Sequence, residues 1–157
     1  MGGVKILIVD DDRFIQLTAS AALEEMGYRL FLADDVQGAV AVLREEPVDV
    51  VVTDHLLPGA TGLSLLSTMR EHLPEPRRIL MTGQADVGLA LAAINQAQVF
   101  RFLQKPLDPG TLRLAVLAAV DDLERDREMR QISELVKASQ AISLVETAHR
   151  PRGVHAA

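Results

Sequence analysis

The chain has 157 residues, of which 48% are hydrophobic and 24% charged, and its formal net charge is −6. This composition is typical of a globular domain with its own core, and the absence of cysteine excludes disulfide bonds and thiolate metal sites. The negative charge argues against nucleic acid as a partner, and no apolar run approaches the roughly 20 residues of a membrane-spanning helix, so we expect no membrane association and a cytoplasmic location.

Short runs rich in β-branched residues alternate with segments of helical periodicity as far as Val120. In chain order, the runs expected to form strands span residues 5–9, 29–33, 48–53, 78–81 and 99–103. Between them, apolar residues three and four positions apart predict four helices. A fifth helix is expected to begin near Pro109, because proline suits a first helical turn.

This alternation predicts an α/β fold, with five strands in a doubly wound parallel sheet and helices on both faces. Gly27 is expected to end the first helix, since glycine is favoured just past a helix C-terminus. In the fourth helix the apolar stripe consists of Val87, Leu91 and Ile94.

The C-terminal part of the chain predicts a helical extension. Residues 1–123 are expected to form the globular domain, residues 124–148 a helical extension or linker, and residues 149–157 a disordered tail. Apolar residues recur at heptad spacing at Leu135, Ala138, Ile142 and Val145. Two interpretations stay open: a homodimer joined in parallel through this helix, and a linker without a partner helix.

Reactive or polar side chains follow four of the five predicted strands. Asp10, Asp11 and Asp12 follow the first strand, Asp54 the third, Thr82 the fourth and Lys105 the fifth. Since the carboxyl ends of parallel strands meet at one edge of the sheet, we expect these side chains to converge in one pocket. Asp12, and the acids Asp34 and Asp35 after the second strand, are interpreted as helix caps.

The clustered carboxylates predict a divalent cation. Two carboxylates about 4 Å apart repel each other by roughly 4 kcal/mol at an effective dielectric constant near 20. Asp10, Asp11 and Asp54 therefore need more positive charge than Lys105 supplies, and Mg²⁺ or Mn²⁺ suits such a set of oxygens. Beside this cation, Asp54 is expected to act as a nucleophile toward phosphorus, with Thr82 and Lys105 binding the phosphoryl oxygens.

Four segments in register resemble the receiver domains of two-component response regulators. They are ILIVDDD at residues 6–12, VVVTDHLLPGATG at 50–62, ILMTG at 79–83 and FLQKP at 102–106. The resemblance implies the flavodoxin-like strand order 2-1-3-4-5. It also implies a phosphoacceptor domain that is not an enzyme and that receives its phosphoryl group from a sensor histidine kinase or a phosphotransfer protein. Residues 93–108 resemble receivers of larger regulators whose outputs include cyclic-dinucleotide phosphodiesterases and transcriptional activators.

Carried over residue by residue, the resemblance implies a metal site and a phosphoacceptor. Asp10 and Asp11 match the acidic pair, with Asp11 as a direct metal ligand. Asp54 matches the phosphorylated aspartate and a further ligand, and the backbone carbonyl of Leu56 would complete the protein's share of the ligands.

The same resemblance implies a switch. Thr82 matches the hydroxyl residue that moves onto the phosphoryl group, and Lys105 matches the lysine that pairs with it. Phe102 matches the aromatic switch residue, and the peptide bond between Lys105 and Pro106 is expected to be cis.

A phosphatase of the haloacid dehalogenase type is the alternative from another class. Asp10 and Asp12 would then form its Asp-x-Asp pair. Phe14 stands where that motif has threonine or valine, and Asp54 would have no role. His55, beside the expected pocket, is interpreted as a surface residue.

Overall fold

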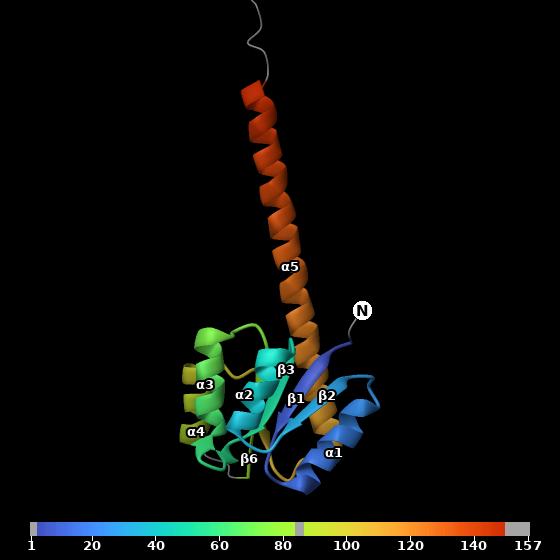
Figure 1. Ribbon diagram of the computed structural model, residues 1–157, viewed down its shortest axis with the longest axis vertical. Coiled ribbons are helices and arrows are strands. Elements are labelled where there is room, and N and C mark those ends of the chain that lie inside the picture. Colours follow the sequence, from blue (N-terminus) through green and yellow to red (C-terminus); the bar gives the residue numbers. More distant parts are fainter. Residues whose placement is uncertain (1–2, 84–86, 150–157) are drawn as a thin grey trace, which may run out of the picture. The chain divides into compact units, whose positions relative to one another are not determined.

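The computed structural model describes residues 3–83 and 87–149 of the chain, and it contains the predicted five-stranded parallel sheet (Figure 1). The strands of this sheet lie in the order β2-β1-β3-β6-β7. Their bounds are β1 Lys5–Val9, β2 Arg29–Ala33, β3 Val50–Asp54, β6 Arg77–Thr82 and β7 Arg101–Gln104. In chain order this is the arrangement 2-1-3-4-5, so the expected flavodoxin-like topology is confirmed.

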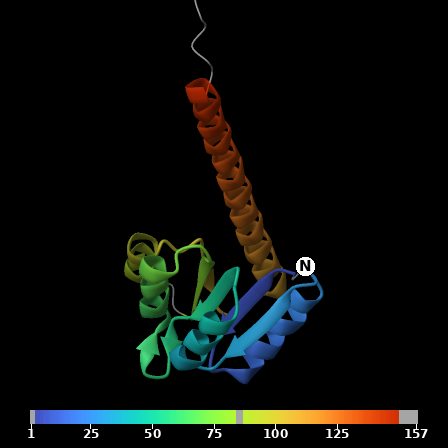
Figure 2. The same cartoon turned by 45° about the horizontal axis from the view of Figure 1, so that its top comes forward.

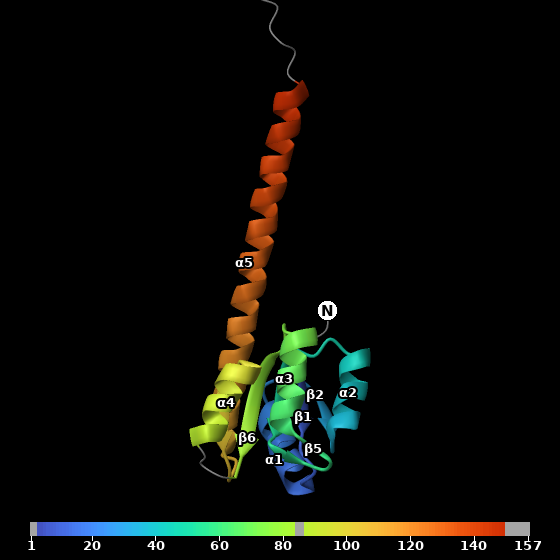
Figure 3. The same ribbon diagram turned by 90° about the vertical axis from the view of Figure 1, so that its left-hand side faces the viewer.

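Within the described ranges, five helices connect and follow the strands (Figures 1 and 2). They are α1 Arg13–Glu24, α2 Val36–Glu45, α3 Gly62–His72, α4 Val87–Ala97 and α5 Pro109–His149. One face of the sheet packs against α1 and the first part of α5, and the other against α2, α3 and α4. Figure 3 shows α3 in front of the sheet, between α4 and α2. Both faces of the central strands are covered, which explains why their sequences are almost continuously apolar.

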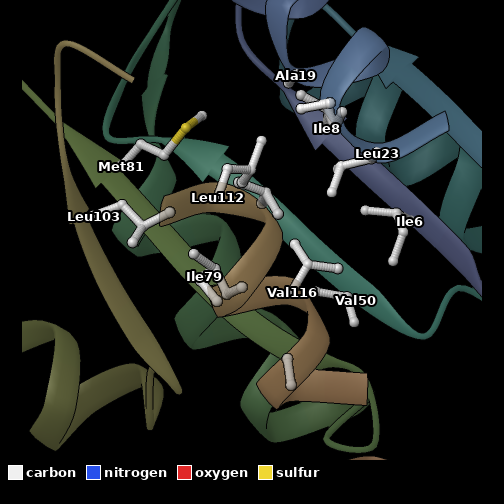
Figure 4. Packing of buried hydrophobic residues seen from close by; sticks show 14 of the residues in the cluster. Ile6, Ile8, Ala19, Leu23, Val50, Ile79, Met81, Leu103, Leu112 and Val116 are labelled. Atoms are coloured by element: carbon white, nitrogen blue, oxygen red, sulfur yellow. The ribbon is translucent and has the colours of Figure 1, made fainter. Parts of the chain in front are cut away.

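The larger hydrophobic cluster shows how the sequence periods produce this packing (Figure 4). Ile6 and Ile8 alternate with residues of the opposite face along β1, and both are fully buried. Leu112 and Val116 of α5 lie four positions apart, on the helix side that faces these strands, and are also fully buried. Truncating such a leucine to alanine typically costs about 2–5 kcal/mol of unfolding free energy.

Two of the predicted helix caps are present. The side chain of Asp12 accepts a hydrogen bond from the Phe14 amide at 2.8 Å, and that of Asp35 accepts one from the Gly38 amide at 2.7 Å. Gly27, just past α1, has a φ of +80°, which explains why glycine occupies this position. Asp34 differs from the expectation, because its carboxylate accepts a hydrogen bond from Gln16 instead of capping a helix.

The bounds of three strands differ from the sequence expectation. β3 begins at Val50 rather than at residue 48, and β6 extends one residue further at each end than predicted. β7 begins at Arg101 rather than at Val99, because the Val99 amide is hydrogen-bonded at 3.2 Å to the carbonyl of Ala93 in α4. A short antiparallel hairpin, β4 Leu56–Leu57 with β5 Ala60–Thr61, was not predicted.

The apolar stripe of α4 lies on the exposed face of the helix, contrary to the usual reading of such a stripe. Val87, Leu91 and Ile94 are all more than half exposed, whereas Ala93 and Ala97 are fully buried. Because alanines allow a helix to approach its neighbours closely, α4 packs through its small residues and leaves its large ones outside.

The helix α5 continues to His149, and the compact unit that contains the sheet ends at Leu123. Every described residue from 124 to 149 is exposed. The expected disordered tail, apart from His149 in the helix, lies outside the described residues. Among the helices that the structure describes, none has the length and apolar character needed to cross a bilayer.

Candidate phosphoacceptor site

The register of the sheet brings the predicted site residues to one edge. β3 lies between β1 and β6, with Val9 opposite Thr53 and Asp54 opposite Met81. β6 pairs with β7 so that Thr82 lies opposite Gln104. All four strands run parallel and end at nearly the same level. Asp10, Asp54, Thr82 and Lys105 are therefore at or just beyond the carboxyl ends of adjacent strands.

The three predicted carboxylates form a cluster. Asp10, Asp11 and Asp54 each present an oxygen atom, and these atoms all lie within 4.8 Å of one another. Asp10 is fully buried and Asp54 is 8% exposed, whereas Asp11 is exposed. Carboxylate oxygens at this spacing fit a hard divalent cation, and the exposed side of Asp11 leaves room for the water molecules that Mg²⁺ retains. Leu56 begins β4, two residues past Asp54.

Lys105 connects two of the carboxylates. Its Nζ atom lies 2.9 Å from Oδ2 of Asp10 and 3.1 Å from Oδ2 of Asp54. Its backbone amide donates a hydrogen bond of 2.7 Å to the carbonyl of Thr82, and the bond between Lys105 and Pro106 is cis, as expected. The backbone hydrogen bond and the two ion pairs fix Lys105 at the start of the loop that follows β7, with its ammonium group over the acidic pocket.

The pKa shifts of this pair have opposing causes. Burial raises the pKa of the Asp10 carboxyl above its ordinary value of 3.8, although hydrogen bonds from Lys105 and from the Asp12 amide oppose this effect. Burial alone would lower the pKa of Lys105, but its hydrogen bonds to Asp10 and Asp54 outweigh that effect and raise the pKa above 10.5. Lys105 is therefore charged at neutral pH. Three ionised carboxylates beside one ammonium group would leave two negative charges, the amount that a divalent cation neutralises.

Gly62 holds the hairpin against the end of β3, a role that the sequence analysis missed. Its amide donates a hydrogen bond of 2.7 Å to the carbonyl of His55. A Cβ atom at Gly62 would overlap the carbonyl oxygen of Asp54, so only glycine permits this approach. The second glycine of the PGATG sequence, at the start of the third helix, could have indicated it. His55 is half-buried rather than a simple surface residue.

The two predicted switch residues lie near one another in the sheet. Thr82 ends β6 and is 4% exposed. Phe102, in the adjacent β7, lies opposite Leu80, is half-buried and packs against the cluster covered by α2, α3 and α4. Both residues are thus on strands that end at the acidic pocket.

The structure does not support the phosphatase alternative, because Asp12, the second aspartate of its motif, is a helix cap. Asp12 is exposed, and its carboxylate accepts the Phe14 amide as a helix cap. The cluster found among the described residues consists of Asp10, Asp11 and Asp54 instead. In the part of the chain that the structure describes, Asp10 and Asp12 therefore do not form an Asp-x-Asp pair directed at one substrate.

Comparison with known proteins agrees with this geometry. Residues 6–117 match the family described as the response regulator receiver domain, and the chain belongs to this family, which acts in two-component signalling. Among curated relatives, the hydrogenase transcriptional regulatory protein HoxA of Cupriavidus necator is 30% identical over an alignment of 152 residues that covers 91% of this chain and 31% of that protein. The chain thus spans about a third of the length of this relative.

Solved receiver structures share the fold. The signal receiver domain of an HD domain-containing protein from Pseudomonas fluorescens Pf-5 has a TM-score of 0.77 and 33% identity, with 82% of this chain and 94% of that chain covered. A CheY-like receiver domain protein from Methanospirillum hungatei JF-1 has a TM-score of 0.75 and 26% identity, with 80% and 99% covered.

Proposed function

We propose that this receiver is a phosphoacceptor switch in which Asp54 accepts a phosphoryl group in the presence of Mg²⁺ or Mn²⁺. The sensor histidine kinase or phosphotransfer protein of its pathway would be the donor. The main support for the proposal is the position of Lys105. Its ammonium group contacts Asp10 and Asp54, beside Asp11. A cytoplasmic location, without membrane or nucleic-acid binding by this chain, stays a prediction.

In the proposed reaction, one carboxylate oxygen of Asp54 attacks the phosphorus atom. An O–P bond forms, and the bond from phosphorus to the donor's imidazole nitrogen breaks, with its electron pair going to that nitrogen. Lys105 and the Thr82 hydroxyl would bind phosphoryl oxygens and stabilise their charge. Asp10, Asp11, Asp54 and the carbonyl of Leu56 would hold the cation, which supplies charge neutralisation when bound.

The chain would assist its own phosphorylation and dephosphorylation without acting as an enzyme on another substrate. After transfer, the product remains attached to Asp54, so the chain is changed by the reaction. Water entering on the exposed side of Asp11 could later hydrolyse the acyl phosphate, which would reset the switch.

Phosphorylation would change a surface made by α4, β7 and α5. Thr82 would move onto the phosphoryl group, and Phe102 would turn inward on the neighbouring strand. The exposed apolar side chains of α4, Val87, Leu91 and Ile94, support this surface as the output face, because a contiguous apolar patch favours binding of a partner.

The helical extension supports a homodimer as the preferred form of association. Leu135, Ile142 and Val145, at heptad spacing with Ala138, are all more than half exposed. Met129 and Ile132, which are also more than half exposed, add apolar side chains nearer the N-terminal end of the extension. A helix without packing partners is only marginally stable in water, so a second copy in parallel orientation would stabilise it. A linker without a partner helix is the alternative.

The test of the proposed site is binding of beryllofluoride, a phosphoryl mimic, to the full chain with and without Mg²⁺. The wild-type chain should bind the mimic only when Mg²⁺ is present. Asp11→Asn should weaken Mg²⁺ binding and mimic binding together. Asp12→Asn is the matched control, since Asp12 is an exposed cap whose hydrogen bond an asparagine can retain. Equal loss in both variants would contradict the assigned ligands.

A further inference from the structure

Gln16 is a buried polar residue on α1 that the proposed reaction does not use. It is 2% exposed. Its Nε2 atom donates two hydrogen bonds of 2.6 Å, one to the backbone carbonyl of Asp10 and one to Oδ1 of Asp34. Its Oε1 atom accepts a hydrogen bond of 3.3 Å from Arg13. Both donor hydrogens are therefore directed at acceptors, and these acceptors come from the ends of β1 and β2.

Together with other hydrogen bonds, these contacts hold both the backbone and the carboxylate of Asp10 in place. The Asp10 amide donates to the carbonyl of Ala33 at 3.0 Å, and the Asp10 carbonyl accepts from Gln16. The Oδ1 atom of Asp10 accepts the Asp12 amide at 2.8 Å, and Oδ2 lies 2.9 Å from Lys105. Asp11 lies between Asp10 and Asp12, so the direction of its carboxylate depends on the peptide units that these bonds hold.

The bond to Asp34, together with the weaker bond from Arg13 to Oε1, determines which way the Gln16 amide faces. If Gln16 had only a structural role, which is to satisfy the Asp10 carbonyl, a buried water molecule or another donor could take its place. The carboxylate of Asp34 can accept from Nε2 but would repel Oε1, so its charge adds to the Arg13 contact in favouring the rotamer in which the amide donates to Asp10. The exposed acid thereby orients a buried donor.

We propose that Gln16, oriented by Asp34, is a positioning residue for the cation-binding segment that contains Asp10 and Asp11. The inference rests on the proposed function, because it concerns the affinity of the same site for Mg²⁺. Residues that orient metal ligands typically change metal affinity about 10- to 100-fold when they are replaced. Gln16→Leu removes both donors at similar volume, and it should weaken Mg²⁺ binding by about 10-fold.

The experiment measures the Kd for Mg²⁺ of the full chain by calorimetric titration at constant ionic strength. Ala22→Gly is the control for stability, since Ala22 is buried on the same helix, away from the pocket. It should lower the unfolding temperature and leave the Kd unchanged. Asp34→Asn and Asp34→Ala lose the same charge, but only the asparagine can keep the acceptor. Asp34→Ala should therefore bind Mg²⁺ more weakly than Asp34→Asn.

A second measurement needs no metal. Hydrogen exchange of the Asp12 amide, which is bonded to Asp10 Oδ1, should be faster in Gln16→Leu than in Ala22→Gly at matched stability. If Gln16→Leu does not fold, the pair of Asp34 variants decides, because Asp34 is exposed.

The possible failures are distinguishable. A wild-type chain that binds no Mg²⁺ at millimolar concentration would contradict the proposed function. Suppose instead that the wild-type chain binds Mg²⁺. An unchanged Kd in Gln16→Leu, or equal Kd values in the two Asp34 variants, would then contradict the positioning role of Gln16 and leave the proposed function standing.

Discussion

The ammonium group of Lys105, the residue just after β7, lies 3.1 Å from a carboxylate oxygen of Asp54 at the end of β3, although these two strands are not neighbours in the sheet. The lysine reaches across the end of β6, where Thr82 lies. A phosphoryl group on Asp54 would therefore be placed between an ammonium group and a hydroxyl group. The same contact means that removing the lysine leaves two carboxylates without their partner.

Replacing Lys105 by alanine should affect the response more than the fold. The uncompensated carboxylates of Asp10 and Asp54 should lower the unfolding free energy of the metal-free chain by about 2 kcal/mol, and Mg²⁺ should restore part of this loss. Urea unfolding with and without Mg²⁺ measures both effects. Lys5→Ala is the matched control, since Lys5 lies 2.8 Å from Glu46 at a distance from the pocket. If Mg²⁺ restored the unfolding free energy equally in both variants, the interpretation that Lys105 compensates the carboxylates of the site would be contradicted.

The raised pKa of Asp10 predicts the sign of a pH dependence. Burial is its main cause, so the native state favours the protonated carboxyl, and this stabilisation is fully present below the ordinary value of 3.8. It is lost as the pH rises through the raised pKa. The stability of Asp10→Asn relative to wild type should therefore increase as the pH rises through this range, and then level off. Urea unfolding in chelator at a series of pH values tests this, and a relative stability that falls with rising pH would contradict it.

The Thr82 hydroxyl should be required for the switch but not for the fold. A hydrogen bond to a charged group contributes about 1.5–3 kcal/mol, so Thr82→Ala should weaken beryllofluoride binding by roughly 10- to 150-fold. It should also reduce the mimic-induced changes in the NMR spectrum around Phe102 and α4. Thr82→Ser keeps the hydroxyl and should respond nearly as wild type does. Equal responses of the alanine and serine variants would exclude Thr82 as the switch residue.

The helical extension should determine the oligomeric state. Sedimentation of the full chain should give a dimer at high micromolar concentration, and a chain of residues 1–125 should give a monomer. Ile142→Lys should dissociate the dimer, because it places a charge at a heptad position of the apolar surface. Leu144→Lys is the control, because Leu144 is also apolar and is 72% exposed but does not belong to the stripe at heptad spacing. Monomers for every chain, with and without beryllofluoride, would leave the extension as a linker.

Local sequence patterns were sufficient to predict most of the fold and the positions of the candidate site residues. The alternation of periods predicted the sheet, and the residues following the strands predicted that Asp10, Asp54, Thr82 and Lys105 lie at one edge. Asp12 and Asp35 follow local capping rules, which act within three residues, so their role as caps was also predictable.

The remaining features depend on contacts that the sequence does not reveal. Gln16 has the spacing of a core position on α1, and its role requires knowing that Asp10 and Asp34 end adjacent strands. The apolar stripe of α4 was misleading for a similar reason, because helical periodicity identifies a face without identifying what covers it. Glycine at position 62 is consistent with a close backbone approach, but that this approach is made to Asp54 depends on the path of a short hairpin.

Phosphorylation of the full chain by acetyl phosphate, followed by intact-protein mass spectrometry, tests the central claim most directly. With Mg²⁺ present, the wild-type chain should gain the mass of a single phosphoryl group, and the label should be lost in hydroxylamine, which cleaves acyl phosphates. Asp54→Asn should gain no such mass, although it should remain folded. Hydroxylamine-sensitive labelling of Asp54→Asn at the wild-type level would contradict the assignment of Asp54 as the phosphoacceptor.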